Sequence, residues 1–210
     1  MPAPLGASIA EHPNADGSIA KLRLFSIVAG VYITPVVCLR LGLIPYKWRF
    51  HVLIAMAIVA VAFAAARYSA NHLGLARPRL WQILGWAGIP SVLLIAGIFL
   101  ADLPHRLQAS QRLPFYLFFV LLSAPAQEFL YRSFLFAELA AVRIPRFGIV
   151  VISAVLYSYM HTIARDGMTT LLTFVVGLIW AGIFSRTRNF FIVALSHAGL
   201  GVAAITLGVI

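Results

Sequence analysis

Three neighbouring polar residues lie in an otherwise apolar stretch and could take part in chemistry. Gln127, Glu128 and Arg132 belong to "SAPAQEFLYRSFLF", residues 123–136. A spacing of four places Glu128 and Arg132 on one face of a helix, whereas Gln127 points about 100° away from Glu128. A charge at the centre of a membrane helix costs roughly 2.5–3.5 kcal/mol on insertion scales, so such residues are candidates for function.

Two histidines in later apolar segments add to this set. Tyr157 precedes His161 by four residues, and Ser196 directly precedes His197. A carboxylate and a histidine can hold a water molecule and accept its proton, and a second histidine can donate a hydrogen bond to an oxyanion. Both effects are strong in a medium of low dielectric constant. The combination therefore predicts a catalytic site buried in the membrane.

Each of these residues also has a structural explanation. Glu128 and Arg132 could form an ion pair that joins two helices, and His161 could lie at the headgroup boundary. We expect Glu138, which is near the end of its apolar segment, to lie at the interface. The co-occurrence of one carboxylate, one arginine and two histidines in neighbouring segments favours the catalytic interpretation.

The composition indicates a membrane protein. Of 210 residues, 62% are hydrophobic and 10% are charged, whereas soluble domains carry about 25% charged residues. The formal charge of +10 comes from short basic groups between apolar runs, which indicates loops at a membrane face and no nucleic-acid partner. The single cysteine, Cys38, excludes an internal disulfide framework.

The chain is expected to be an all-α, polytopic membrane helix bundle with about seven transmembrane helices, because a span needs about 20 apolar residues. Pro125 is expected to divide the long fourth segment into a short piece and a kinked helix. The expected spans run near residues 22–44, 50–70, 80–101, 113–142, 147–163, 168–185 and 190–210.

Three regions follow from this pattern. Residues 1–20 lack the basic and apolar parts of a signal peptide and are expected to form a disordered tail. Residues 21–112 would form three transmembrane helices, and residues 113–210 would form the catalytic core, because the polar candidates lie there. We expect a multi-pass protein of a bacterial cytoplasmic (inner) membrane.

The order of the polar motifs resembles the CAAX-protease and bacteriocin-processing (CPBP) family of intramembrane glutamic endopeptidases. That family carries E-E-x-x-x-R, then an aromatic residue three residues before a histidine, then His-x-x-x-Asn. Here the corresponding stretches are "QEFLYR" at 127–132, "YSYMH" at 157–161 and "HAGLG" at 197–201. The resemblance covers roughly residues 113–205.

Two positions depart from the family pattern. Gln127 stands where the family has its first glutamate, and a neutral amide cannot act as a general base. Gly201 stands in place of the asparagine, which removes one oxyanion donor that Ser196 or a backbone N–H would have to replace. We expect Glu128 to face His161 and to take over as the base; the alternative places Gln127 there and makes the chain inactive.

The resemblance implies an endopeptidase for peptide bonds of membrane-associated or lipidated proteins and peptides. Glu128 and His161 would activate the water, His197 would stabilise the oxyanion, and Arg132 would hold Glu128 ionised. Gln127 would position water or substrate, and Tyr157 would orient a polar group. These functional positions are Glu128, His161, His197, Arg132 and Gln127, with Tyr157, Ser196 and Gly201 in support.

Two other interpretations stay open. Glu128, His161 and His197 could hold zinc with an open fourth position, although the family needs no metal and no H-E-x-x-H motif is present. Alternatively, the chain could be an inactive member of the same fold with an immunity or scaffold role, which the changes at Gln127 and Gly201 support.

Overall fold

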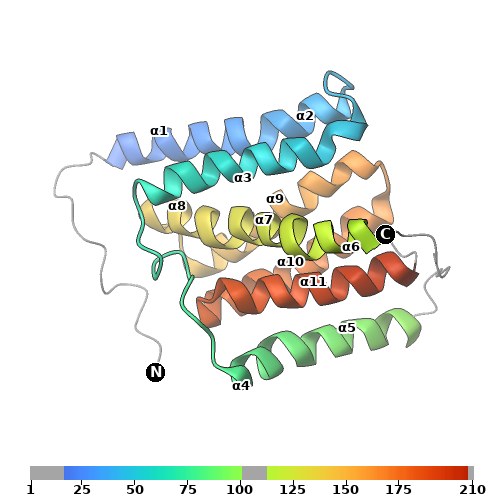
Figure 1. Ribbon diagram of the computed structural model, residues 1–210. Helices are drawn as coiled ribbons and strands as arrows, with labels where there is room; N and C mark the ends of the chain where they lie inside the picture. Colours follow the sequence, from blue (N-terminus) through green and yellow to red (C-terminus); the bar gives the residue numbers. More distant parts are fainter. Residues whose placement is uncertain (1–16, 101–112, 208–210) are drawn as a thin grey trace.

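The fold is a bundle of long helices packed side by side (Figure 1). In this computed structural model, the described residues are 17–100 and 113–207, and they contain no strand. The all-α fold predicted from the apolar runs is confirmed.

Seven of the described helical stretches are long and apolar enough to cross a bilayer, which confirms the expected number. The first begins at Gly17, inside the segment expected to be a tail, and residues 1–16 lie outside the described part. The spans are Gly17–Arg40, Tyr46–Ala65, Leu80–Gly97, Leu113–Ala141, Arg146–Ala164, Gly167–Thr187 and Phe190–Leu207.

Most spans combine an α-helix with short turns of another helical type. The first span consists of α1 (Gly17–Ile27), the π-helix η1 (Val28–Ile33) and α2 (Thr34–Arg40). The second consists of the 3-10 helix η2 (Tyr46–Trp48) and α3 (Arg49–Ala65). The third consists of α4 (Leu80–Ile83), the π-helix η3 (Leu84–Gly88) and α5 (Ile89–Leu100). The last three consist of α9 (Arg146–His161) with the 3-10 helix η6 (Thr162–Ala164), α10 (Gly167–Thr187) and α11 (Phe190–Leu207).

The fourth span is one unbroken helical path, so the expected division at Pro125 was wrong. A wider π-helical turn ends at Ser123, two residues before Pro125, and accommodates a ring that would clash with the preceding turn of a regular α-helix. The parts of this span are α6 (Leu113–Phe118), the π-helix η4 (Phe119–Ser123), α7 (Ala124–Glu128), the π-helix η5 (Phe129–Phe134) and α8 (Leu135–Ala141).

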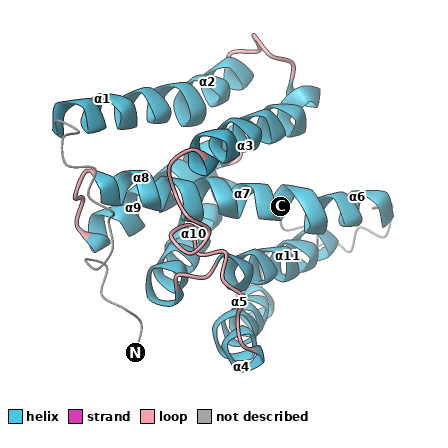
Figure 2. Cartoon of the chain, turned by 60° about the vertical axis from the view of Figure 1, so that its left-hand side comes forward, coloured by secondary structure: helices cyan, strands magenta, loops and turns pink. Residues whose placement is uncertain are grey.

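The fourth span lies at the centre of the bundle and supplies most of the largest fully buried side chains. α3 contacts it at η5 and α7, and α11 contacts it at α7 (Figures 1 and 2). α5 lies on the other side of α11. The polar residues near the junction of α7 and η5 are therefore enclosed by protein on several sides.

α9 and α10 form a closely packed antiparallel hairpin. The Asp166 carboxylate caps α10 by accepting a hydrogen bond from the Thr169 backbone N–H at 2.6 Å. Gly177 allows the close approach, because a Cβ there would lie 3.1 Å from Cδ1 of Tyr157. Small residues at helix contacts are typical of membrane proteins.

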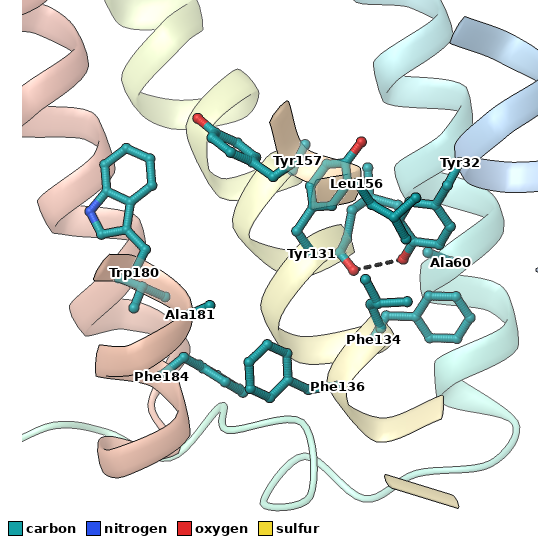
Figure 3. Packing of buried hydrophobic residues seen from close by; sticks show 14 of the residues in the cluster. Tyr32, Ala60, Tyr131, Phe134, Phe136, Leu156, Tyr157, Trp180, Ala181 and Phe184 are labelled. Carbon is teal, nitrogen blue, oxygen red and sulfur yellow. Dashed lines mark hydrogen bonds between the residues drawn. The ribbon is translucent and has the colours of Figure 1, made fainter. Parts of the chain in front are cut away.

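A row of aromatic rings joins four spans through the core (Figure 3). Tyr32 packs edge-on against Tyr131 with ring centroids 5.3 Å apart, and Tyr131 packs on Tyr157 at 5.5 Å. Tyr157 then meets Trp180 of α10 at 5.9 Å. The hydroxyl of Tyr32 donates to the Leu130 carbonyl at 2.7 Å, which ties the first span to the fourth.

Candidate active site

The central feature of the site is an ion pair buried inside the fourth span. The side chains of Glu128 and Arg132 are both 0% exposed, and Arg132 Nε lies 3.3 Å from Glu128 Oε2. The prediction that they share a helix face is confirmed. Their burial between helices keeps both charges away from lipid, where they would be costly.

The second carboxylate oxygen of Glu128 binds a histidine from the last span. Glu128 Oε1 lies 2.7 Å from Nδ1 of His197, which is 4% exposed. A contact this short is typical of a charge-assisted hydrogen bond. It joins α7 to α11 across 69 residues of sequence.

Arg132 has further partners on α9 and α10. Its Nη2 donates to the carbonyl oxygen of Gly177 at 3.2 Å. The guanidinium lies 4.5 Å from the centroid of the Tyr157 ring and 5.7 Å from that of Trp180. Cation–π contacts of this kind stabilise a desolvated guanidinium and fix its position. Arg132 therefore forms an ion pair with Glu128, while the rings of Tyr157 and Trp180 fix the position of its guanidinium.

The His197 ring is held in place by aromatic side chains. Trp180 stacks on it with centroids 4.2 Å apart and an interplanar angle of 20°. Phe119 and Tyr157 approach it edge-on at 5.8 and 5.9 Å. The Tyr157 hydroxyl also lies 3.5 Å from His197 Nε2, in a long hydrogen bond. Both ring nitrogens of His197 thus face polar groups of the site.

Ser196 supports this arrangement indirectly. Its hydroxyl accepts a hydrogen bond from Nε1 of Trp180 at 3.1 Å and lies 2.9 Å from the hydroxyl of Ser91. We expected Ser196 as an oxyanion donor, but here its hydroxyl is engaged with these two side chains. Its position fixes the indole that stacks on His197.

Gly201 has no room for the amide that the family pattern would place there. A Cβ built on Gly201 would collide with the ring of Phe119. Phe119, from η4, is buried and therefore fills the space that a side chain at position 201 would need. The sequence motifs did not single out Phe119, because its contact with Gly201 joins residues 82 positions apart.

His161 lies in a separate place, at the wall of a cavity of about 160 Å³. Its Nδ1 lies 2.9 Å from the carbonyl oxygen of Tyr157, and its ring centroid is 4.6 Å from that of Tyr157. Gln127 lines the same cavity. The other lining residues are Val36, Leu39, Tyr46, Arg49, Phe50, Val52, Leu53, Met56, Met160, Ile163 and Ala164.

This geometry corrects the expected arrangement, in which Glu128 faced His161. Glu128 turns to His197 and Arg132, while its neighbour Gln127 shares the cavity with His161. The angular offset between adjacent helical residues is the physical cause, because a helix cannot present both neighbours to the same partner. Tyr157 contacts both histidines and connects the two parts of the site.

The zinc hypothesis needs Glu128, His161 and His197 at one point. Glu128 and His197 meet, but no group of three or more His, Cys, Asp or Glu side chains suited to a metal ion is formed within residues 17–100 and 113–207. The Tyr157 ring contacts the rings of both His161 and His197.

A second buried carboxylate lies at the far end of the fourth span. We expected Glu138 at the interface, but its side chain is 0% exposed. Glu138 Oε2 lies 3.0 Å from Nε of Arg23, and Oε1 accepts from the Tyr68 hydroxyl at 2.9 Å. Burial, followed by the negative charge of Glu138, raises the pKa of Tyr68 above its ordinary value. Glu138 therefore joins α1 and the 66–79 connection to α8.

Comparison with known proteins supplies the family. Residues 109–203 match the model of the type II CAAX prenyl endopeptidase Rce1-like family. The match agrees with the resemblance found over roughly residues 113–205. No curated protein and no solved structure matches the chain.

The Rce1-like region contains both parts of the polar site. The buried pair Glu128 and Arg132, with His197, lies within the matched range, as do Gln127 and His161 at the cavity. Much of the cavity wall lies outside that range, on α2, η2 and α3. The Rce1-like family is one of endopeptidases, and the seven apolar spans fit a multi-pass integral membrane protein.

Proposed function

We propose that this protein is an intramembrane endopeptidase that hydrolyses peptide bonds of membrane-associated or lipidated proteins and peptides. Three observations support the proposal: the Rce1-like match, the seven apolar spans and the polar side chains enclosed among them. The family's name refers to prenylated substrates, which suggests a lipidated protein tail as one substrate class. The bacterial cytoplasmic membrane is the location we propose.

The observation that carries the proposal is the buried set Arg132–Glu128–His197. The Glu128 carboxylate, 2.7 Å from Nδ1, accepts a hydrogen bond from that nitrogen, and a proton on Nε2 as well would make Nε2–H a second donor. An Nε2–H donor aimed at a peptide carbonyl would stabilise the oxyanion of a tetrahedral intermediate. We therefore retain His197 as the oxyanion donor and propose that Glu128, held by Arg132, positions its ring.

Aromatic packing gives this donor a fixed direction. Trp180 and Phe119 hold the His197 ring, and Tyr157 lies beside Nε2. Donors that are already oriented need no reorganisation when charge develops, which is the main source of oxyanion stabilisation in enzymes. Removing one such donor typically costs about 10²–10³-fold in kcat.

The test uses purified protein in liposomes with a library of membrane-tethered peptides. Wild-type protein is expected to cleave at least one peptide, and Glu128→Ala and His197→Ala are expected to lose that cleavage. His51→Ala provides a matched control, because His51 is exposed, packs on the Trp48 ring and does not line the cavity. Cleavage by Glu128→Ala at the wild-type rate would contradict the proposal.

A second candidate is an inactive Rce1-like protein with an immunity or scaffold role. The observation that favours it is Gln127, a neutral amide, on the same cavity as His161. A carboxylate at that position could accept a proton from water, whereas an amide cannot. Absence of cleavage by the wild-type protein, with cleavage appearing in Gln127→Glu, would support this candidate.

A metal-independent reaction is part of the main proposal, and zinc dependence is its alternative. The family resemblance implies a reaction without a metal, and the Rce1-like match agrees with that resemblance. Of the three candidate zinc ligands, Glu128 and His197 are the two that meet directly. Cleavage that survives dialysis against a strong chelator is expected. Loss of cleavage on chelation, with recovery on adding zinc, would favour the alternative.

A further inference from the structure

The third span reaches the candidate site through a serine hydroxyl. Ser91, in α5, has its hydroxyl oxygen 2.9 Å from that of Ser196 on α11. Among residues 17–100 and 113–207, this is the one side-chain hydrogen bond that joins the third span to another span. The third span packs mainly on α11, and little of it is buried within the bundle (Figure 1). A peripheral span outside the matched residues 109–203 therefore has a polar connection to the site.

The hydroxyl of Ser196 has two partners, and their chemistry sets the direction of its hydrogen bonds. Nε1 of Trp180 can only donate, so the Ser196 oxygen accepts from it at 3.1 Å. Among the described contacts, the hydroxyl oxygen of Ser91 is the acceptor that is left for the hydrogen of Ser196. The result is a chain of hydrogen bonds in which the indole donates to Ser196 and Ser196 donates to Ser91.

This direction differs from the common behaviour of a hydroxyl inside a helix, which bonds to a carbonyl oxygen of the preceding turn. Thr206 of the same helix does so, with its hydroxyl oxygen 2.7 Å from the Val202 carbonyl oxygen. Ser26 in α1 makes the corresponding bond in its own helix. The described contacts give Ser196 no such bond. Ser91 therefore supplies the acceptor that keeps the Ser196 hydroxyl turned away from its own helix and toward the indole.

The indole that this chain holds contacts both side chains that bind Glu128. Trp180 stacks on His197 with ring centroids 4.2 Å apart, and its centroid lies 5.7 Å from the guanidinium carbon of Arg132. Trp180 is 3% exposed, and a buried indole N–H requires an acceptor. If Ser196 turned back to its own helix, the indole would rotate toward another acceptor. That rotation would tilt the stacked ring of His197, whose Nε2 is the proposed oxyanion donor.

We propose that Ser91 is a positioning residue of the active site. Through Ser196 it fixes the indole of Trp180, and the indole in turn fixes the direction of the His197 ring. The inference rests on the proposed peptidase function, because the direction of this ring affects the reaction only if His197 donates to the oxyanion. The third span, although peripheral, thereby contributes to the rate of the reaction.

NMR of ¹⁵N-tryptophan-labelled protein in nanodiscs tests the hydroxyl chain without any substrate. Trp180→Phe identifies the Trp180 signal among those of the four tryptophans. In Ser91→Ala, we expect the Nε1–H proton signal of Trp180 to move upfield, because the Ser196 hydroxyl turns back to its own helix and the indole loses its acceptor. Ser91→Thr keeps a hydroxyl and should keep the wild-type shift.

Ser26→Ala is the matched control, because the Ser26 hydroxyl is exposed and bonds to the Leu22 carbonyl of its own helix. It should leave the Trp180 signal unchanged. An unchanged Trp180 signal in Ser91→Ala would overturn the hydroxyl chain.

Kinetics on the liposome substrates test the positioning role. Ser91→Ala should lower kcat by about 2–10-fold, the effect of losing one neutral hydrogen bond, with little change in KM. Ser91→Thr should restore the wild-type kcat, and Ser26→Ala should keep it. A shifted Trp180 signal with an unchanged kcat in Ser91→Ala would overturn the positioning role. A wild-type protein that cleaves nothing, but whose Trp180 signal moves in Ser91→Ala, would keep the hydroxyl chain and remove the peptidase function.

Discussion

Glu128 and His197 are joined by a 2.7 Å hydrogen bond between two buried side chains from different spans. This contact, together with the Arg132 ion pair, places the one carboxylate of the site away from the cavity that holds His161. The site therefore has a buried charged part and a cavity part, which are connected by Tyr157.

Removing both charges of the buried Glu128–Arg132 pair should restore the stability that is lost when Glu128 alone is removed. It should not restore cleavage. Glu128→Ala leaves the Arg132 guanidinium buried without its carboxylate and should destabilise the protein by about 3–5 kcal/mol. The double variant Glu128→Gln with Arg132→Met removes both charges and should recover most of that stability. Its cleavage should stay absent, because His197 still lacks a carboxylate.

Thermal unfolding in detergent and cleavage in liposomes measure these two effects separately. Two findings would contradict the assigned role of Glu128: a double variant that regains cleavage, or a Glu128→Ala protein as stable as wild type.

A carboxylate at position 127 should raise activity. Gln127→Glu places an ionisable group beside His161 on the cavity, where it can accept the proton of a bound water. We expect kcat to rise by about 10²-fold or more, within the range of general-base effects. The pH profile of kcat should also gain a limb at low pH, since the new base is inactive when protonated. An unchanged rate and profile would show that position 127 does not face the reacting water.

The fit between Gly201 and Phe119 should limit substitution at position 201. Gly201→Ala places a methyl group against the Phe119 ring and should cost about 1–3 kcal/mol, the usual range for overpacking. The same change at Gly199 is the control, because a Cβ there meets no atom within 4 Å. Phe119→Leu added to Gly201→Ala should restore stability. Equal unfolding temperatures for Gly199→Ala and Gly201→Ala would contradict the contact.

The cap of α10 should make stability depend on acid pH. The hydrogen bond from Thr169 to the Asp166 carboxylate lowers the pKa of Asp166 in the folded protein. A lowered pKa stabilises the folded state above the unfolded pKa, and this contribution is lost as the pH falls through the folded pKa. Asp166→Asn should keep the cap and lose this part of the pH dependence, whereas Asp166→Ala should lose the cap itself.

Unfolding midpoints of the three proteins, measured from neutral pH down to pH values below the ordinary pKa of aspartate, check the cap. The expected effect is small because Asp166 is exposed. An Asp166→Asn curve parallel to the wild-type curve throughout this range would show that the carboxylate does not contribute through its charge.

The sequence was sufficient for the class of fold and for the polar residues. Apolar runs of bilayer length predicted seven spans, because a helix satisfies all its backbone polar groups within one segment of the chain. The ionisable residues that interrupt these runs marked Glu128, Arg132 and His197, which the structure brings together, since a buried ionisable group needs a partner. The motif order also predicted the Rce1-like match.

Which neighbour faces which histidine was decided only by the tertiary structure. The sequence shows that Gln127 and Glu128 must point in different directions, but the rotation of the fourth span depends on its packing against α3, α9 and α11. The π-helical turns η4 and η5 add to this rotation and have no clear sequence signal. The contact of Phe119 with Gly201 likewise depends on the approach of two helices far apart in sequence. Local periodicity determines which face of a helix a residue lies on, and only the packing of the whole bundle determines what that face meets.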